Sequence, residues 1–461
     1  MSDHSLKKSP IPYETYQATC LGELSEYLSQ YEHVFALRTR NVLPKAVDYI
    51  EGLLATERNK RNLERMSERT ITNYQSNHHF LSNSPWSAHQ LLLEVAHACQ
   101  RRLGDPRQQC LSIDESCMTK SGKASVGVSR QYNGNRGKTD NCQVGVYAAL
   151  SEGRDVGLVN CRLYLPDNWI DNPERCRKAA IPEKARVKKS KVDLALDMIN
   201  ELVENGIDFG WINADALYGH SHKFRNEISR LGKDFVVDIR SHLKVYLNDP
   251  KPFDTGKGRK HTNWETQETN IVVSQYYETI SKSQFKRVKI RKSTKGWLEG
   301  DIHLKRVWLW DGKSAKATEH TLIIRKGPKK SSPVKYAISN LTIDQRSYQQ
   351  FAFMQAQRFF IERAFEDAKG ELGMADYQVR SFNAWYHHQA LVMLAMDYIN
   401  QLKAKKADSI PLLSIRDIRL QIIELKVNNG VAMEREIMQM LKRHKQRQAD
   451  IDRHYPDEQS G

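Results

Sequence analysis

The spacing of apolar residues changes near residue 109, and this change constrains the fold more than any other feature. Before it, apolar side chains recur at three- and four-residue intervals over 21–35, 42–54 and 88–103, which is the period of an amphipathic helix. After it, residues 124–132 and 142–150 alternate between apolar and polar, which is the period of a strand. The sequence therefore predicts a helical region followed by a sheet.

The stretch from 105 to 240 combines short turns with helical crossovers. Its predicted elements, in order, are strands 110–113, 124–132, 142–150 and 157–165, helix 192–203, strand 209–214, helix 222–231 and strand 235–239. Glycine-containing turns between the early strands indicate an antiparallel meander, and the later helices indicate crossover connections. This order predicts an α/β fold.

Residues 241–335 return to strand-like text and predict a β-rich insertion, with strands at 269–277, 285–290, 303–310 and 320–324. A long helix over 347–369 follows, and further helices are predicted at 385–403, 415–427 and 432–443. The chain then divides into a helical N-terminal region (1–104), a first core segment (105–240), the insertion (241–335), a segment that completes the core (336–380) and a helical C-terminal region (381–461).

Basic residues exceed acidic ones by 71 to 55, which leaves a formal charge of +16. Such a surplus favours a polyanionic partner, because each neutralised phosphate releases condensed counterions. Charge alone leaves DNA, RNA and acidic protein surfaces open. The N-terminal region fits either a small DNA-binding module or a charged, solvated helical face.

The seven cysteines show neither C-x-x-C nor zinc-type spacing, so reduced thiols are expected. No apolar stretch has the roughly 20 residues that a membrane span needs, and the first residues contain no apolar signal core. The expected location is cytoplasmic and, with DNA as the partner, nucleoid-associated. No glycine-rich P-loop is present, which argues against an ATP-driven mechanism.

Three acidic residues are the candidate catalytic and metal-binding groups. Asp114 and Asp215 each stand where an apolar strand runs out into polar residues, and Glu362 lies within a predicted helix. Carboxylates at neighbouring strand ends and on a helix across the sheet can hold two cations about 3.5 to 4 Å apart. Oxygen ligands suit Mg²⁺, with Mn²⁺ as a substitute. The alternative is that each aspartate is a turn or cap residue, as single aspartates at strand ends more often are.

The helix that carries Glu362 has the most specific pattern. Arg358, Glu362, Phe365 and Lys369 follow one another at offsets of four, three and four, so they share one helix face. Basic residues on both sides of a metal-binding glutamate can hold phosphates beside the metals. The alternative is a surface Arg–Glu ion pair, although the apolar neighbours indicate that the glutamate is not simply solvated.

This helix text resembles the R-E-K part of the Y-R-E-K signature of DDE transposases from bacterial insertion sequences. Four more segments fit the resemblance: Ser112–Ser116 with Lys120–Lys123 after it, Ala214–Gly219, Asp140–Val146 and Tyr49–Leu54. It spans roughly residues 40 to 400. One departure stands out, because Gln355 occupies the place of the signature tyrosine.

The resemblance implies a ribonuclease-H-like catalytic core interrupted by a β-rich insertion, with helical N-terminal and C-terminal regions. It also implies a DNA transposase that cleaves the ends of an insertion sequence and transfers the freed 3′ end into target DNA. Its partners would be double-stranded DNA, as terminal inverted repeats and as target, and a second copy of the chain in a synaptic dimer. Two other functions stay open: a non-transposing nuclease on the same core, and a catalytically silent DNA-binding protein derived from a transposase.

Several side chains are predicted to contact DNA. Arg358 and Lys369 would hold phosphates, and Lys120 and Lys123 follow the first strand motif. Relatives often use an aromatic side chain to hold a flipped base, for which Trp297, Trp308 and Trp310 in the insertion are candidates. Aromatic residues in strand text are, however, more often packing residues.

Overall fold

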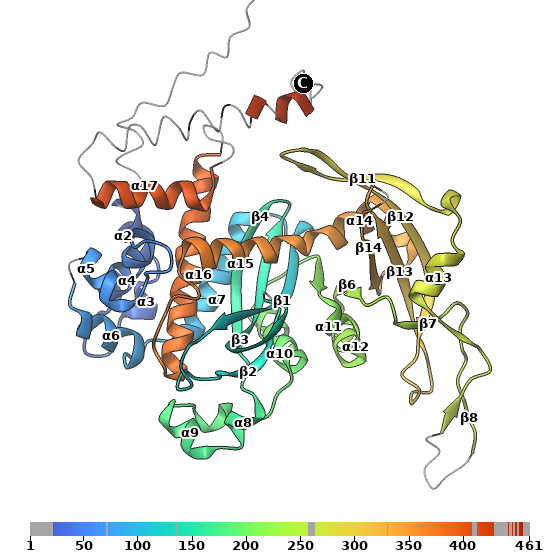
Figure 1. Cartoon of the computed structure of the whole chain (residues 1–461), viewed down its shortest axis with the longest axis horizontal. Helices are drawn as coiled ribbons and strands as arrows, with labels where there is room; N and C mark the ends of the chain where they lie inside the picture. The colour runs from blue at the N-terminus through green and yellow to red at the C-terminus, as the bar shows by residue number, and fades with distance from the viewer. Residues whose placement is uncertain are drawn as a thin grey trace, which may run out of the picture.

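A mixed α/β architecture is observed in the computed structural model, as the sequence predicts (Figure 1). The structure describes residues 22–454 apart from 71, 135, 257–262, 330, 408–412, 428–440, 442–444, 446–447 and 450. The helix predicted over 432–443 lies almost entirely outside the described residues.

One large sheet runs through the molecule, and its first half contains both candidate aspartates. The strand order in this half is β4–β3–β1–β5–β6, and β2 pairs with the first residues of β3. β1 is antiparallel to β3 and parallel to β5, which is parallel to β6. The strands are β1 (Cys110–Thr119), β2 (Ser129–Asn133), β3 (Lys138–Glu152), β4 (Asp155–Leu163), β5 (Trp211–Ala214) and β6 (Asp234–Ile239).

Helices connect and cover this half of the sheet. The sequence Ser190-x-x-Asp193 forms a reciprocal capping box at the start of α10, and the buried face of that helix packs on the sheet core. Two shorter helices connect β5 to β6. Parallel neighbouring strands need such a crossover connection, because the chain must return to the edge of the sheet at which β5 began. The connecting helices are α8 (Asp167–Ile170), α9 (Pro173–Lys178), α10 (Lys191–Glu204), α11 (Ala216–Gly219) and α12 (His222–Arg230).

The segment predicted as an insertion extends the same sheet. β14 (Val334–Ser339), which begins where this segment ends, pairs antiparallel with β6, so hydrogen bonding is continuous between the two halves. Figure 1 shows these strands at the opposite end from the N-terminal helices. The strands are β7 (Lys244–Tyr246), β8 (Phe253–Asp254), β9 (Trp264–Glu265), β10 (Asn270–Val272), β11 (Lys286–Ser293), β12 (Gly296–Leu309), β13 (Thr318–Lys326) and β14 (Val334–Ser339).

The predicted strand over 269–277 is wrong for most of its length. Only β10 is extended, and α13 (Val273–Thr279) follows it directly. Val273 and Tyr276 are buried three residues apart, which is a helical spacing, and the hydroxyl of Tyr276 hydrogen-bonds with His303. Tertiary packing therefore overrides the strand preference of these β-branched and aromatic residues.

The N-terminal and C-terminal helices share one apolar core. In this core the 24-residue α16, almost entirely buried, packs on α7, α6 and α4. Figure 1 shows α16 crossing beside the N-terminal helices. The helices are α2 (Gly22–Ser29), α3 (Glu32–Phe35), α4 (Leu43–Ala55), α5 (Leu63–Thr70), α6 (Tyr74–Ser82), α7 (Ala88–Leu103), α16 (Phe382–Lys405) and α17 (Ile415–Val427).

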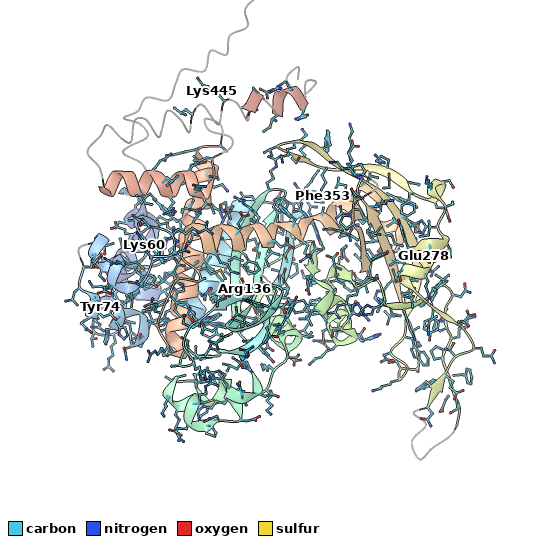
Figure 2. All side chains as sticks on the ribbon, viewed as in Figure 1. Lys60, Tyr74, Arg136, Glu278, Phe353 and Lys445 are labelled. Atoms are coloured by element: carbon cyan, nitrogen blue, oxygen red, sulfur yellow. The ribbon has the colours of Figure 1, made fainter. Side chains whose placement is uncertain are left out.

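The helix predicted over 347–369 is observed as two, α14 (Tyr348–Gln357) and α15 (Phe359–Glu371), which meet at Arg358. α14 packs in the core of the insertion strands, and α15 packs in the core shared by the terminal helices. Figure 2 labels Phe353 on α14, whose ring lies 6.1 Å from that of Trp211 on β5. The two helices α14 and α15 thus pack in two different apolar cores, and Arg358 lies at the junction between them.

Two further observations bear on the sequence predictions. The six cysteines in the described part of the chain are free, as expected of reduced thiols. Among the described helices, none is both long enough and apolar enough to cross a bilayer.

Candidate active site

Asp114 and Asp215 lie side by side at the sheet. Ile113 on β1 pairs with Ala214, the last residue of the parallel strand β5. Asp215 directly follows β5, whereas Asp114 lies within β1, so the strand end predicted at Asp114 is wrong. Asp215 is also the N-cap of α11, where its Oδ1 accepts a hydrogen bond from the Leu217 amide at 2.9 Å. The parallel pairing therefore fixes the two carboxylates at one level of the sheet.

A third carboxylate joins them. Ligand oxygens of Asp114, Glu115 and Asp215 all lie within 4.8 Å of one another, the separation expected of groups that share a cation. Lys191 at the start of α10 donates to Glu115 Oε1 at 2.6 Å. In the described part of the chain no other acidic, histidine or cysteine cluster has this geometry.

Burial and charge crowding perturb these carboxyls. Burial raises the pKa of Asp114 to about 7, with Arg358 lowering it and Asp215 raising it further. Burial and Glu115 likewise raise the pKa of Asp215. Burial raises the pKa of the Tyr218 hydroxyl, and the nearby carboxylates of Glu115, Asp215 and Asp114 raise it further. A bound cation would offset this repulsion.

Arg358 connects the cluster to the helix. Its Nη1 donates to Asp114 at 3.0 Å, its Nη2 to Glu362 at 2.8 Å and its Nε to Asp238 at 2.9 Å. One guanidinium thereby uses its fork of donors on three carboxylates from β1, β6 and α15. Glu362 is half exposed and stands apart from the Asp114–Glu115–Asp215 cluster, to which Arg358 links it.

The predicted basic contacts differ in their surroundings. Lys369 is largely buried, and its pKa is lowered by burial and raised by Cys117 and Asp114, so it lies on the site's side of α15. Lys120 instead donates to the carbonyl of Tyr377 at 2.7 Å, with its ammonium 4.0 Å from that ring. Lys123 is exposed.

The three tryptophans lie along the insertion. Trp297 pairs with Lys292 at the β11–β12 turn, and the ammonium of Lys289 lies 5.6 Å from its ring. Trp308 pairs with Tyr246, and Trp310 donates to the Ser314 carbonyl at 2.7 Å, both near the other end of β12. Trp297 therefore lies at the opposite end of the hairpin from the other two.

Sequence reasoning missed Glu115, Asp238 and Lys191. Asp238 carried a usable signal, because it lies near the end of β6 as Asp215 follows the end of β5, and parallel strands end at a common edge. Glu115 was adjacent to a selected aspartate. The contact of Lys191 with Glu115 could not be predicted from the sequence, since it depends on where the start of α10 lies relative to β1.

Comparison with known proteins identifies the family of the chain. Residues 34–296, more than half of the chain, match the family model described as DDE superfamily endonuclease, and the match includes both aspartates. The chain belongs to this family. It is also 32% identical over 182 residues to the "Probable transposase for insertion sequence element IS701" of Microchaete diplosiphon. That alignment covers 38% of this chain and 43% of the relative, less than half of either.

Among solved structures, the chain is similar to the piggyBac transposase in a cryo-EM synaptic complex with hairpin DNA. The superposition covers 96% of this chain and 84% of the other, with 10% identity and a TM-score of 0.40. A likeness at that level carries no functional weight.

Proposed function

We propose that this protein is a DNA transposase, which cleaves a phosphodiester at the ends of an insertion sequence and joins the freed 3′ end to target DNA. The observation that carries the proposal is the meeting of Asp114 and Asp215 on adjacent parallel strands, with Arg358 linking Asp114 to Glu362. Membership of the DDE endonuclease family and the insertion-sequence relative support it.

The five strands β4–β3–β1–β5–β6 form the proposed ribonuclease-H-like core. Four of them, β1, β4, β5 and β6, run in one direction and β3 runs in the other, and α15 packs on β4, β3 and β1 (Figure 1). In this division the strands from β7 to β13 are the insertion, and the helices before residue 105 and after 380 flank the core. The N-terminal helices are the proposed DNA-binding region.

The carboxylate cluster fits a divalent cation. All of its ligand atoms are oxygens, which Mg²⁺ and Mn²⁺ prefer, and its buried acids repel one another. Asp114 and Asp215 would hold Mg²⁺, with Glu362 as the third ligand of a two-ion site. When bound, such ions activate the attacking water or hydroxyl and stabilise the leaving oxygen of an in-line displacement.

The side chains of the chain itself bind and orient the DNA. Arg358 donates to three carboxylates here, and a cation bound to them would free its planar fork of donors for a phosphate. Lys369 lies on the same helix face. Lys123 and the ring of Trp297 are proposed to contact DNA farther from the reacting phosphate. The surplus of 16 positive charges favours the polyanion throughout.

Cut-and-paste movement requires two element ends in one complex, so the proposed working form is a homodimer on paired ends. The direct test is a two-plasmid assay in which the inverted repeats that flank the coding sequence enclose a resistance marker. The proposal expects marker insertions at new sites with wild type and none with Asp215→Asn. Excision or nicking without new insertions would favour the non-transposing nuclease, and repeat binding without any cutting would favour the silent DNA-binding protein.

A further inference from the structure

A pocket of about 350 Å³ opens beside Glu362, between the insertion strands and the junction of α14 and α15. Arg358 and Glu362 line its side toward the carboxylates, and Arg291, Arg325 and Lys335 line it from β11, β13 and β14. The pocket thus shares Arg358, Glu362 and Asp238 with the surroundings of the candidate active site.

Within the described part of the chain, Arg291, Arg325 and Lys335 make no ion pair at contact distance, although Asp238 attracts Arg325, and Asp238 and Glu362 attract Lys335, from farther away. Arg325 is only 9% exposed, yet its one side-chain hydrogen bond within the described part of the chain joins its Nε to a neutral amide. Lys335 makes neither an ion pair nor a side-chain hydrogen bond to any residue that the structure describes. The Nε of Arg291 is buried without an acceptor, while its guanidinium lies 4.9 Å from the Phe360 ring.

The position of Arg325 is set by Gln355, the residue that replaces the signature tyrosine. Gln355 Oε1 accepts from Arg325 Nε at 2.9 Å, and Gln355 Nε2 donates to Asp238 at 3.3 Å. Asp238 in turn accepts from Arg358. A buried chain of contacts therefore connects Arg325 to the arginine of the active site, and the terminal nitrogens of Arg325 stay free for an acceptor.

We infer that this pocket is a phosphate subsite, in which Arg325 and Lys335 bind the backbone phosphate next to the one that reacts, with Gln355 as the residue that positions Arg325. This inference rests on the proposed function, because it assigns residues that would bind one phosphate of the DNA that a transposase cuts.

A phosphate fits these observations better than other ligands. Buried cations are normally paired with anions, so the buried Arg325, which makes no ion pair at contact distance beside a hollow, favours an anionic ligand. Burial lowers the pKa of Arg325, Asp238 raises it, and the neighbouring Arg291 lowers it, so an added anion would stabilise the charged form of Arg325. Glu362, Asp238 and Glu299 also line the pocket, so the proposed phosphate lies against Arg325 and Lys335 and away from these three acids.

The test measures binding of the full-length protein to a short duplex that carries the element's inverted repeat, in EDTA so that nothing is cut. In a second series, one phosphate at a time near the end of the repeat is replaced by an uncharged methylphosphonate. Lys335→Gln and Arg325→Gln are compared with Lys313→Gln, which removes an exposed positive charge at the other end of the β12–β13 hairpin.

We expect Lys335→Gln and Arg325→Gln each to weaken binding roughly 10-fold, as loss of a charge-assisted hydrogen bond does. The slope of log K against log salt should fall by about 0.9 for one lost phosphate contact. One methylphosphonate position should cost wild type affinity and cost these variants none. Gln355→Ala should lose sensitivity at that same position, which a purely structural role would leave intact.

Two outcomes would overturn the subsite. One is that the pocket variants bind with the same salt slope as Lys313→Gln, and the other is that they keep the wild-type methylphosphonate pattern. If Arg325→Gln does not fold, the exposed Lys335 decides the matter. Wild type that neither binds nor cuts the repeat would instead refute the proposed function itself.

Discussion

Arg358 Nη1 lies 3.0 Å from Asp114 Oδ2, although the two residues are 244 positions apart in the chain. This contact joins the first strand of the sheet to the glutamate helix. Because the same guanidinium also binds Glu362 and Asp238, it neutralises carboxylates that would otherwise repel one another. A cation bound at the cluster would reduce the same repulsion between carboxylates that Arg358 now reduces.

Replacing Arg358 should make the fold depend on metal. Arg358→Gln leaves partly buried carboxylates unpaired, so the free energy of unfolding without metal should fall by about 3 kcal/mol. Mg²⁺ should then raise the melting temperature of the variant more than that of wild type, measured by thermal unfolding across a Mg²⁺ series. Arg363→Gln is the matched control, since the half-exposed Arg363 pairs only with Glu366 and Asp367 of its own helix and not with the cluster, a loss of about 1 kcal/mol. An equal Mg²⁺ response in all three proteins would contradict this explanation.

Glu115 and Glu362 compete for the role of third ligand, and paired substitutions separate them. Glu115 lies inside the cluster, but its carboxylate is already ion-paired with Lys191. Glu362 is half exposed, and it could bind a metal ion once its ion pair with Arg358 is broken. Glu362→Gln should abolish Mg²⁺-dependent cleavage at every metal concentration. Glu115→Gln should retain cleavage but need roughly 10- to 100-fold more Mg²⁺, as loss of a supporting group does. The opposite pattern would make Glu115 the ligand.

The local part of this site could be predicted from sequence, and the long-range part could not. An apolar run that stops at an aspartate led to both Asp114 and Asp215. It marks a strand end only at Asp215, because β1 continues past Asp114 to Thr119. The break at Arg358 was missed, because residues 347–369 have continuous helical periodicity and the break depends on two separate cores. Pairing of β14 with β6 was likewise invisible, since register between distant strands leaves no local pattern.

Lys120 is expected to act mainly on stability. Its ammonium is buried against the Tyr377 ring and carbonyl, and burial lowers its pKa to about 8. Lys120→Ala should therefore lower the free energy of unfolding by about 1 to 3 kcal/mol in urea titrations, by leaving that carbonyl unpaired. Exposed Lys123→Ala should leave stability unchanged. If Lys120→Ala had normal stability but a smaller slope of log K against log salt in DNA binding, Lys120 would be a DNA contact as predicted from the sequence.

Buried histidines should make the protein sensitive to acid. His388 accepts from the Tyr49 hydroxyl at 2.8 Å and faces the Met374 carbonyl, and burial lowers its pKa to about 3. Below pH about 6.5 the unfolded chain binds a proton that the folded chain excludes, so stability falls by about 1.4 kcal/mol per pH unit for this residue.

His388→Gln should be less stable at pH 7 but should lose stability less steeply between pH 6 and 4, by one proton. Urea unfolding at several pH values measures this slope. Exposed His33→Gln is the control and should keep the wild-type slope. An unchanged slope in His388→Gln would show that other groups dominate acid unfolding.

The most direct test of the central claim is Mg²⁺-dependent cleavage of a duplex carrying the element's own end, with wild type beside Asp114→Asn, Asp215→Asn and Glu362→Gln. The account predicts that wild type cuts at the end of the repeat only with Mg²⁺ or Mn²⁺. All three variants should bind the same duplex and fail to cut it. Cutting by any of the three variants at the wild-type rate would contradict the assignment of that carboxylate to the metal site.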